Sequence, residues 1–123
     1  AKTQDFSNAK LVIEKGLAIA STSKSLNANW DYVMLEFAQF EYKNNRFEEA
    51  IGILIEGMQR RKTNRHKYLQ LIEGYYNDTA VNMLQQGRIQ QGIDRLQAGL
   101  TLIPNSRTLQ KNLGMATRQK GRK

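Results

Sequence analysis

The apolar positions of this chain follow a helical period, and one pattern of them occurs three times. In residues 47–57, FEEAIGILIEG, the first position of the pattern is followed by others at offsets of three, seven and ten. Such offsets place side chains on one face of a helix. The same skeleton occurs in residues 6–16, FSNAKLVIEKG, and in residues 89–99, IQQGIDRLQAG. The pattern predicts three equivalent helices that present small residues to their neighbours.

The three copies are regularly spaced along the chain. Ala9 and Ala50 are 41 residues apart, and Ala50 and Gly92 are 42 residues apart. Self-similarity at such a period is typical of stacked supersecondary units. Glycine or alanine at the fixed offsets has a steric reason, because a small side chain allows a second helix to approach closely. We therefore expect tight helix crossings at these positions.

A second kind of apolar stripe precedes the last two copies. One stripe runs over residues 30–42 and the other over residues 68–84. Each ends at a short polar turn, KNNR at 43–46 or QQGR at 85–88, and the repeated pattern follows. Helix, turn and helix in this order predict antiparallel helix pairs.

Each predicted pair has a small residue late in its first helix and an Ala-x-x-x-Phe-like pattern in its second, and so resembles the tetratricopeptide repeat. The resemblance covers residues 5–121 and includes Pro104, since a proline commonly closes this unit. It implies an all-α, right-handed solenoid of stacked antiparallel helix pairs with about six helices. The family's usual period is about 34 residues. We interpret residues 65–72, RHKYLQLI, as two added helical turns in the second repeat.

The pattern predicts a single domain over residues 1–123. Its expected parts are a second-type helix at 5–20, repeats at 24–61 and 64–103, and a terminal first-type or capping helix at 106–120. The first helix lacks a partner for its apolar face, made of Phe6, Ala9, Ile13 and Leu17. We therefore expect either a piece of a longer protein or a contact supplied by another subunit.

Composition restricts the possible functions. The net charge of +8 favours acidic partners. The chain has no cysteine and one histidine, so we predict neither a transition-metal site nor a cofactor. His66 stands between Arg65 and Lys67 without a candidate catalytic partner, and we interpret it as a helix-surface residue. No nucleophile elbow, paired-carboxylate motif or glycine-rich phosphate loop is present. We therefore predict no catalytic residues and no enzyme.

The sequence leaves the cellular compartment open. No apolar run approaches the roughly 20 residues that span a membrane, and the absence of cysteine says nothing about the redox compartment. We favour a cytoplasmic placement. A mitochondrial outer-surface, other membrane-associated or periplasmic placement stays open if the chain belongs to a longer protein.

The resemblance also implies a ligand surface, because first helices line a concave groove in the tetratricopeptide family. Carried onto this chain, the groove positions are Tyr32, Leu35, Gln39, Tyr42, Lys43, Asn77, Val81, Gln85, Lys111, Met115 and Arg118. They offer apolar anchors, amides and cations for an extended or helical peptide. The Lys and Asn clamp of the chaperone-binding subgroup is not reproduced, since Leu35 and Gln39 occupy its positions.

We therefore expect a protein–protein interaction scaffold that binds a peptide or partner protein. One alternative is a basic surface that binds nucleic acid or an anionic membrane. It would use the tail RQKGRK at 118–123 and the run RRKTNRHK at 60–67, whose cations are Arg60, Arg61, Lys62, Arg65 and Lys67. A second alternative is self-assembly into homo-oligomers, in which the face of the first helix docks on the C-terminal end of another copy.

Overall fold

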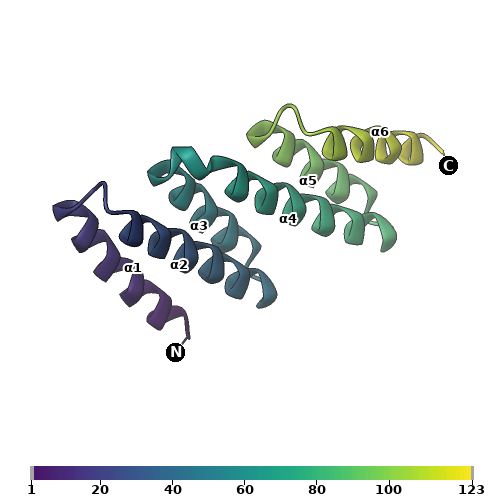
Figure 1. Cartoon of the computed structure of the whole chain (residues 1–123). Coiled ribbons are helices and arrows are strands. Elements are labelled where there is room, and N and C mark those ends of the chain that lie inside the picture. The colour runs from purple at the N-terminus through teal and green to yellow at the C-terminus, as the bar shows by residue number, and fades with distance from the viewer. Residues whose placement is uncertain (1, 123) are drawn as a thin grey trace. The chain divides into compact units, whose positions relative to one another are not determined.

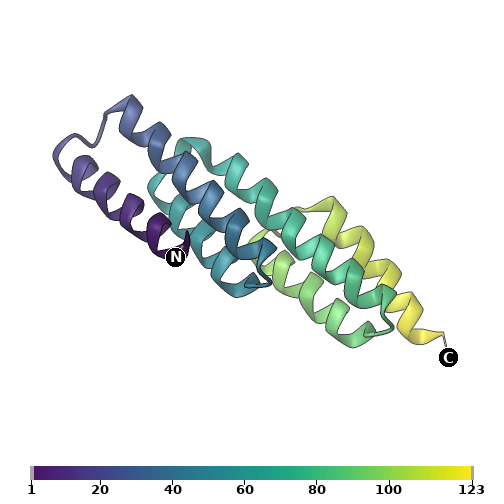
Figure 2. The same cartoon turned by 90° about the horizontal axis from the view of Figure 1, so that it is seen from below.

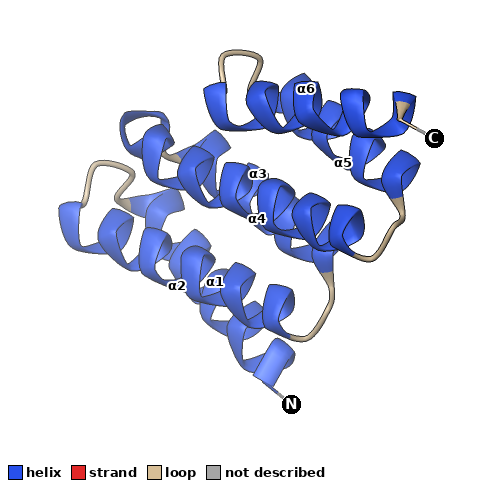
Figure 3. Ribbon diagram, turned by 90° about the vertical axis from the view of Figure 1, so that its right-hand side faces the viewer, coloured by secondary structure: helices blue, strands red, loops and turns tan. Residues whose placement is uncertain are grey.

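The computed structural model describes residues 2–122, and this part of the chain is helical without a strand (Figure 3). Its elements are α1 (Lys2–Ile19), α2 (Lys24–Lys43), α3 (Phe47–Arg60), the short 3-10 helix η1 (Lys62–Asn64), α4 (Arg65–Gln85), α5 (Ile89–Leu102) and α6 (Arg107–Gly121). The predicted all-α, repeat-like fold with about six helices is confirmed. The right-handed superhelix stays a prediction.

The helices form two compact units, residues 1–68 (unit 1) and residues 69–123 (unit 2), and the division falls inside α4. In unit 1, α2 packs against both α1 and α3 (Figures 1 and 2). In unit 2, α5 packs against α6. Within each unit, consecutive helices run antiparallel and are joined by short turns (Figure 1), as the alternation of stripes and turns predicts.

The turns after α2 and α4 have the same construction. Asn45 has φ 62° and Gly87 has φ 83°, so both adopt the left-handed conformation that commonly ends a helix. The next backbone amide then donates back to the helix: Arg46 to the Glu41 carbonyl and Arg88 to the Met83 carbonyl, each at 2.9 Å. The two predicted turns are thus equivalent helix terminations.

The first-type helices α2 and α6 also begin alike. Ser23 Oγ accepts from the Leu26 amide at 3.2 Å, and Ser106 Oγ accepts from the Leu109 amide at 3.1 Å. A serine at this position satisfies an amide that the first turn of a helix leaves without an intrahelical partner.

Three glycines mark equivalent crossings between a second-type helix and the first-type helix that follows it. A methyl group added at Gly16 would lie 3.1 Å from Leu26 Cδ1. One added at Gly57 would lie 2.9 Å from Tyr68 Cζ, and one at Gly99 would lie 2.9 Å from Leu109 Cδ1. The predicted tight crossings are confirmed, and the middle one differs by having tyrosine where the others have leucine.

The apolar face predicted to be uncovered on the first helix is covered in the structure. Phe6 stacks on Phe37 with ring centroids 5.2 Å apart, and Ile13 and Leu17 are buried. The expectation that this face is free for self-assembly was therefore wrong, because α2 packs on it. The large apolar residues of α1 that stay exposed are Leu11, Val12 and Ile19.

The added residues 65–72 are helical, as predicted, since they all lie in α4. The first repeat also has a long first-type helix. Helix α4 has 21 residues and α2 has 20. The first-type helices α2 and α4 are therefore both long, which explains why the spacing of 41 to 42 residues is uniform.

Candidate functional site

Unit 2 contains a hollow of about 310 Å³ between α4 and α6. Its lining residues are Val81, Leu84, Gln85, Asn112, Met115, Ala116 and Gln119. Four of these side chains are apolar and three are amides, and none is charged. Met115 is 51% exposed, so an apolar surface is accessible at the rim. Amides beside apolar side chains can recognise a peptide, since they hydrogen-bond its backbone while its side chains are buried.

The walls of this hollow are held in place by contacts between α4 and its neighbours. Asn112 donates to Asn77 Oδ1 at 2.5 Å, and Ser106 Oγ donates to Glu73 Oε2 at 2.5 Å. Leu84 packs closely against Gly92 of α5: a methyl group added at Gly92 would be 2.7 Å from Leu84 Cδ2. The hollow is therefore formed before any ligand binds, which reduces the entropic cost of binding.

Unit 2 is basic, and its last helix is the most basic part. Unit 2 has eight Lys and Arg residues against three Asp and Glu residues, and residues 106–123 contain six cations and no acid. Lys111, Met115 and Arg118 are four and three residues apart and therefore share one side of α6. Both cations are exposed. An acidic segment would be attracted to this side of α6.

Unit 1 has a hollow of about 370 Å³ between α1 and α2. It is lined by Lys2, Phe6, Tyr32, Glu36, Gln39, Phe40 and Lys43. Phe6 lies against Phe40 with ring centroids 5.8 Å apart, and Tyr32 is 66% exposed. This hollow is more aromatic than that of unit 2 and carries both signs of charge.

The predicted groove residues fall into several groups. Tyr32, Gln39 and Lys43 line the hollow of unit 1, and Val81, Gln85 and Met115 line the hollow of unit 2. Lys111 and Arg118 are exposed on α6 outside the lining. Leu35, Tyr42 and Asn77 are half-buried, and Asn77 accepts the hydrogen bond from Asn112. Their role in binding stays a prediction.

Sequence reasoning missed the lining residues that a single helical stripe does not contain. Phe6 comes from α1, and Asn112, Ala116 and Gln119 lie on the side of α6 that faces α4. The family offsets describe one face of each first-type helix, so they do not include residues of an adjacent face or of a second-type helix. For Asn112 the sequence did contain an indication, because the same residue type, Asn29, occupies the equivalent position 83 residues earlier.

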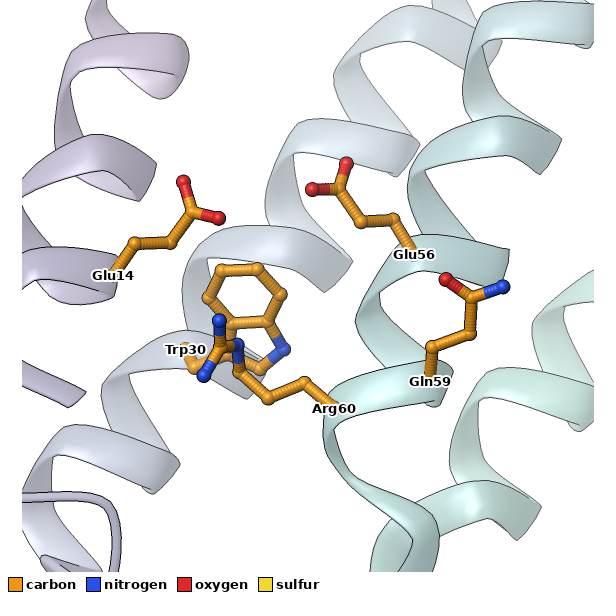
Figure 4. Close-up of a pocket in the computed structure, with 5 residues that line it drawn as sticks. All are labelled: Glu14, Trp30, Glu56, Gln59 and Arg60. Carbon is orange, nitrogen blue, oxygen red and sulfur yellow. The ribbon is translucent and has the colours of Figure 1, made fainter. Parts of the chain in front are cut away.

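A third hollow, of about 440 Å³, lies over Trp30 (Figure 4). The carboxylates of Glu14 on α1 and Glu56 on α3 extend toward each other across it. Lys10 Nζ pairs with Glu56 Oε2 at 2.6 Å, and the Arg60 guanidinium lies 5.0 Å from the centre of the Trp30 ring. Glu56 is thus already paired with Lys10, and the Trp30 ring is already covered by Arg60. This hollow is therefore a weaker candidate for a ligand site than the other two.

Part of the predicted basic patch has a structural role. Asp31 Oδ2 accepts from Arg61 Nε at 3.0 Å and from Asn64 Nδ2 at 2.9 Å, while Asp31 Oδ1 accepts from the Tyr68 hydroxyl at 2.6 Å. Burial, together with the hydrogen bond to Asp31, raises the pKa of Tyr68 well above its ordinary value. This network joins α2 to the start of α4.

The network and the stacked Arg60 leave fewer cations of the run available to phosphates. Arg61 is neutralised by Asp31, and Arg60 lies over Trp30. Lys62, Arg65 and Lys67 are exposed. Contact with nucleic acid or anionic membrane at this run stays a prediction that now depends mainly on these three residues.

The described residues contain no cluster of three or more His, Cys, Asp or Glu side chains that could hold a metal ion. His66 is exposed at the start of α4. None of the helices described in residues 2–122 is long and apolar enough to cross a membrane.

The chain matches no protein-family model, no curated protein and no solved structure. The resemblance to the tetratricopeptide repeat therefore stays a prediction from sequence, and a proposal about function depends on the geometry of the site.

Proposed function

We propose that this protein is a protein-binding module and that the α4–α6 hollow of unit 2 receives an apolar side chain of an acidic peptide segment. The observation that carries the proposal is the combination found there: a preformed apolar hollow, amides in its wall and an acid-free basic helix beside it. An apolar anchor would enter the hollow beside Met115. The amides of Gln85 and Gln119 would hydrogen-bond the peptide backbone.

Charge and shape have separate parts in this proposal. The cations of α6 attract an acidic partner and raise its association rate, and they do so less at high salt. The apolar contact at the hollow would determine how long the partner stays bound, since buried anchors dominate interface energies. Binding should therefore depend on Met115 more than on any one of the exposed cations.

The proposal can be tested with an array of 12-residue peptides that carry a central Leu, Met or Phe flanked by Asp and Glu. Matched peptides would carry Lys in place of the acids. We expect wild-type protein to bind acidic members and the Met115→Asp variant to bind them at least about tenfold more weakly. Leu102→Asp is the control, because Leu102 is also an exposed apolar residue of unit 2 but does not line the hollow.

Two outcomes would overturn the proposal. One is an array without a member that binds wild-type protein in a saturable way. The other is binding that Met115→Asp and Leu102→Asp weaken equally. If a single-stranded oligonucleotide binds instead, with affinity that falls steeply as salt is added, the basic-surface alternative replaces the proposal.

A further inference from the structure

The second-type helices carry one stripe of residues in the same register. On α1 the stripe is Ala9, Val12, Gly16 and Ile19, on α3 it is Ala50, Ile53, Gly57 and Arg60, and on α5 it is Gly92, Arg95, Gly99 and Leu102. The steps of three, four and three residues place each set on one side of its helix. The three stripes can therefore be compared position by position.

On α3 and α5 the first-type helix that precedes the stripe in the chain contacts it, although Arg60 and Leu102 at the C-terminal end of the stripe are exposed. In unit 1, Trp30 of α2 donates to the Gly57 carbonyl at 3.2 Å and lies under Arg60. In unit 2, Arg95 donates to Thr79 of α4 at 3.4 Å, and a methyl group at Gly99 would lie 3.0 Å from Tyr76 Cβ. In both units this side of the second-type helix is thus a helix-packing surface.

On α1 two residues of the stripe, Val12 and Ile19, lie open, whereas Gly16 contacts Leu26 of α2 and Ala9 is half-buried. Val12 is 69% exposed and Ile19 is 90% exposed, although the equivalent side chains Arg95 and Arg60 each contact a first-type helix. Helix α1 lies at one edge of unit 1 (Figure 1), and its other apolar side is the one that packs on α2. An open apolar stripe bordered by polar residues is typical of a binding surface.

The polar residue seven positions after each crossing glycine gives a second indication that a helix is missing from the surface of α1. In two of the three cases this residue donates to an acid of the preceding first-type helix. Asn64 donates to Asp31, and Ser106 donates to Glu73. Both donors stand seven residues after a crossing glycine, and Asp31 and Glu73 are equivalent acids of the preceding first-type helices, 42 residues apart. Ser23 stands seven residues after Gly16, but its side chain bonds within its own turn, with Ser25 and the Leu26 amide.

A second equivalent pair of residues shows the same difference. Asn112 of α6 donates to Asn77 of α4, which lies one turn after Glu73, while the equivalent Asn29 of α2 is exposed. The pair α1–α2 thus repeats Gly, Ser, Leu and Asn of the pair α5–α6 at Gly16, Ser23, Leu26 and Asn29. In unit 2 three of the four equivalent residues, Gly99, Ser106 and Asn112, contact α4. The pair α1–α2 therefore repeats the residues with which the pair α5–α6 contacts α4.

We infer that the stripe of α1 and the start of α2 form a docking site for an acidic amphipathic helix of a partner protein, with the side-chain pattern of residues 69–85. That segment contains two acids and no Lys or Arg. The site presents the exposed cations Lys15 and Lys24 beside the stripe and beside Ser23. An acid of the partner would pair with Ser23 and Lys24, and an amide one turn later would pair with Asn29.

The C-terminal helix of a second copy does not fit this site. In the common register, Gly114 of α6 stands where Glu73 stands in α4, and Arg118 stands where Asn77 stands. Helix α6 therefore lacks the acid that Ser23 and Lys24 would meet and adds a cation instead. A partner helix with the acid in place is the better occupant.

The test uses wild-type protein and a synthetic peptide of residues 69–85 with a hydrocarbon staple between positions 70 and 74. The staple replaces Gln70, which is exposed, and Gly74, where an added side chain would meet nothing within 4 Å. Anisotropy of the labelled peptide gives the affinity, and amide shifts of ¹⁵N-labelled protein locate the site. We expect saturable binding with shifts at the α1 stripe, Ser23 and Asn29.

The double variant Val12→Glu/Ile19→Glu should weaken this binding at least about tenfold, because both acids would face the acidic helix. Leu11→Glu is the matched control on the same helix, exposed but off the stripe, and should change affinity by less than about twofold. A peptide with Glu73→Lys and Tyr76→Asp should not bind.

Several results would overturn the inference. These are the absence of saturable binding, equal loss in Leu11→Glu, or shifts confined to α5 and α6. Sedimentation of the protein alone provides a further check, since a dimer dissociated by Ile19→Glu would make a second copy the occupant. The function proposed for unit 2 depends on Met115 and not on Val12 or Ile19, so each proposal can fail without the other.

Discussion

The pairs α1–α2 and α5–α6 have the same register and five identical residues, yet they have different surroundings. In unit 2, α4 packs on the pair through Leu84, Tyr76 and Asn77. In unit 1 the equivalent surface is open, with Val12 and Ile19 in solvent. Both pairs close through the same glycine–leucine crossing. The comparison shows that the surface for a third helix is specified locally, whether or not a helix covers it.

The largest expected effect on the free energy of unfolding comes from replacing one of the two equivalent acids, Asp31 and Glu73. Asp31→Ala should lower the free energy of unfolding by about 3 kcal/mol or more, because Arg61 and the Tyr68 hydroxyl lose their acceptor inside the protein. Glu73→Ala removes one hydrogen bond and should cost about 1 kcal/mol. Urea unfolding of both variants measures the difference. Equal costs would show that the network around Asp31 adds little.

Enlarging the small residues should separate covered from open stripes. Ala50→Leu should cost about 1–3 kcal/mol, because Ala50 is fully buried and has no room for a larger side chain. Ala80→Leu should behave alike for the same reason. A change at an open position of α1, Val12→Leu, should cost less than about 0.5 kcal/mol, because Val12 is 69% exposed. Thermal unfolding would contradict the assigned helix pairing if Ala50→Leu and Ala80→Leu had no effect.

The two equivalent asparagines offer a smaller contrast. Asn112→Ala should cost about 1 kcal/mol, since it removes the hydrogen bond to Asn77. Asn29→Ala should change the stability of the free protein by less than about 0.5 kcal/mol, because Asn29 is exposed. Chemical denaturation gives both values. If Asn29→Ala were as costly as Asn112→Ala, the surface on α2 would already be engaged.

The smallest effect is a gain in stability at two glycines where an added methyl group meets no neighbouring atom. Nothing lies within 4 Å of a methyl group added at Gly52 or Gly74. Alanine is a better helix former than glycine, so Gly52→Ala and Gly74→Ala should each stabilise the protein by up to about 1 kcal/mol. Gly57→Ala is the counterpart: it should destabilise the protein, because the methyl group would collide with the Tyr68 ring. Melting temperatures that rise for all three would contradict the close crossing at Gly57.

Part of the candidate site was predictable from sequence, because the resemblance to the tetratricopeptide repeat implies which positions of the first-type helices form a ligand surface. Tyr32, Val81 and Met115 were predicted to share a ligand surface, and each lines a hollow. The partners of these residues were not predictable. Phe6 of α1 and Asn112 of α6 join the hollows because another helix lies beside them, and periodicity within one helix contains no information about its neighbour.

The sequence by itself determined the helices, their turns and the small residues at their crossings, because these depend on local conformational preference and on a repeated pattern. Only the tertiary structure decided which face of α1 is covered. The face that packs on α2 was expected to need a partner from outside the predicted repeats, since an amphipathic second-type helix has two packing sides and its pattern does not say which one is filled. The same limit applies to Arg61 and Asp31, 30 residues apart, which folding brings together at 3.0 Å.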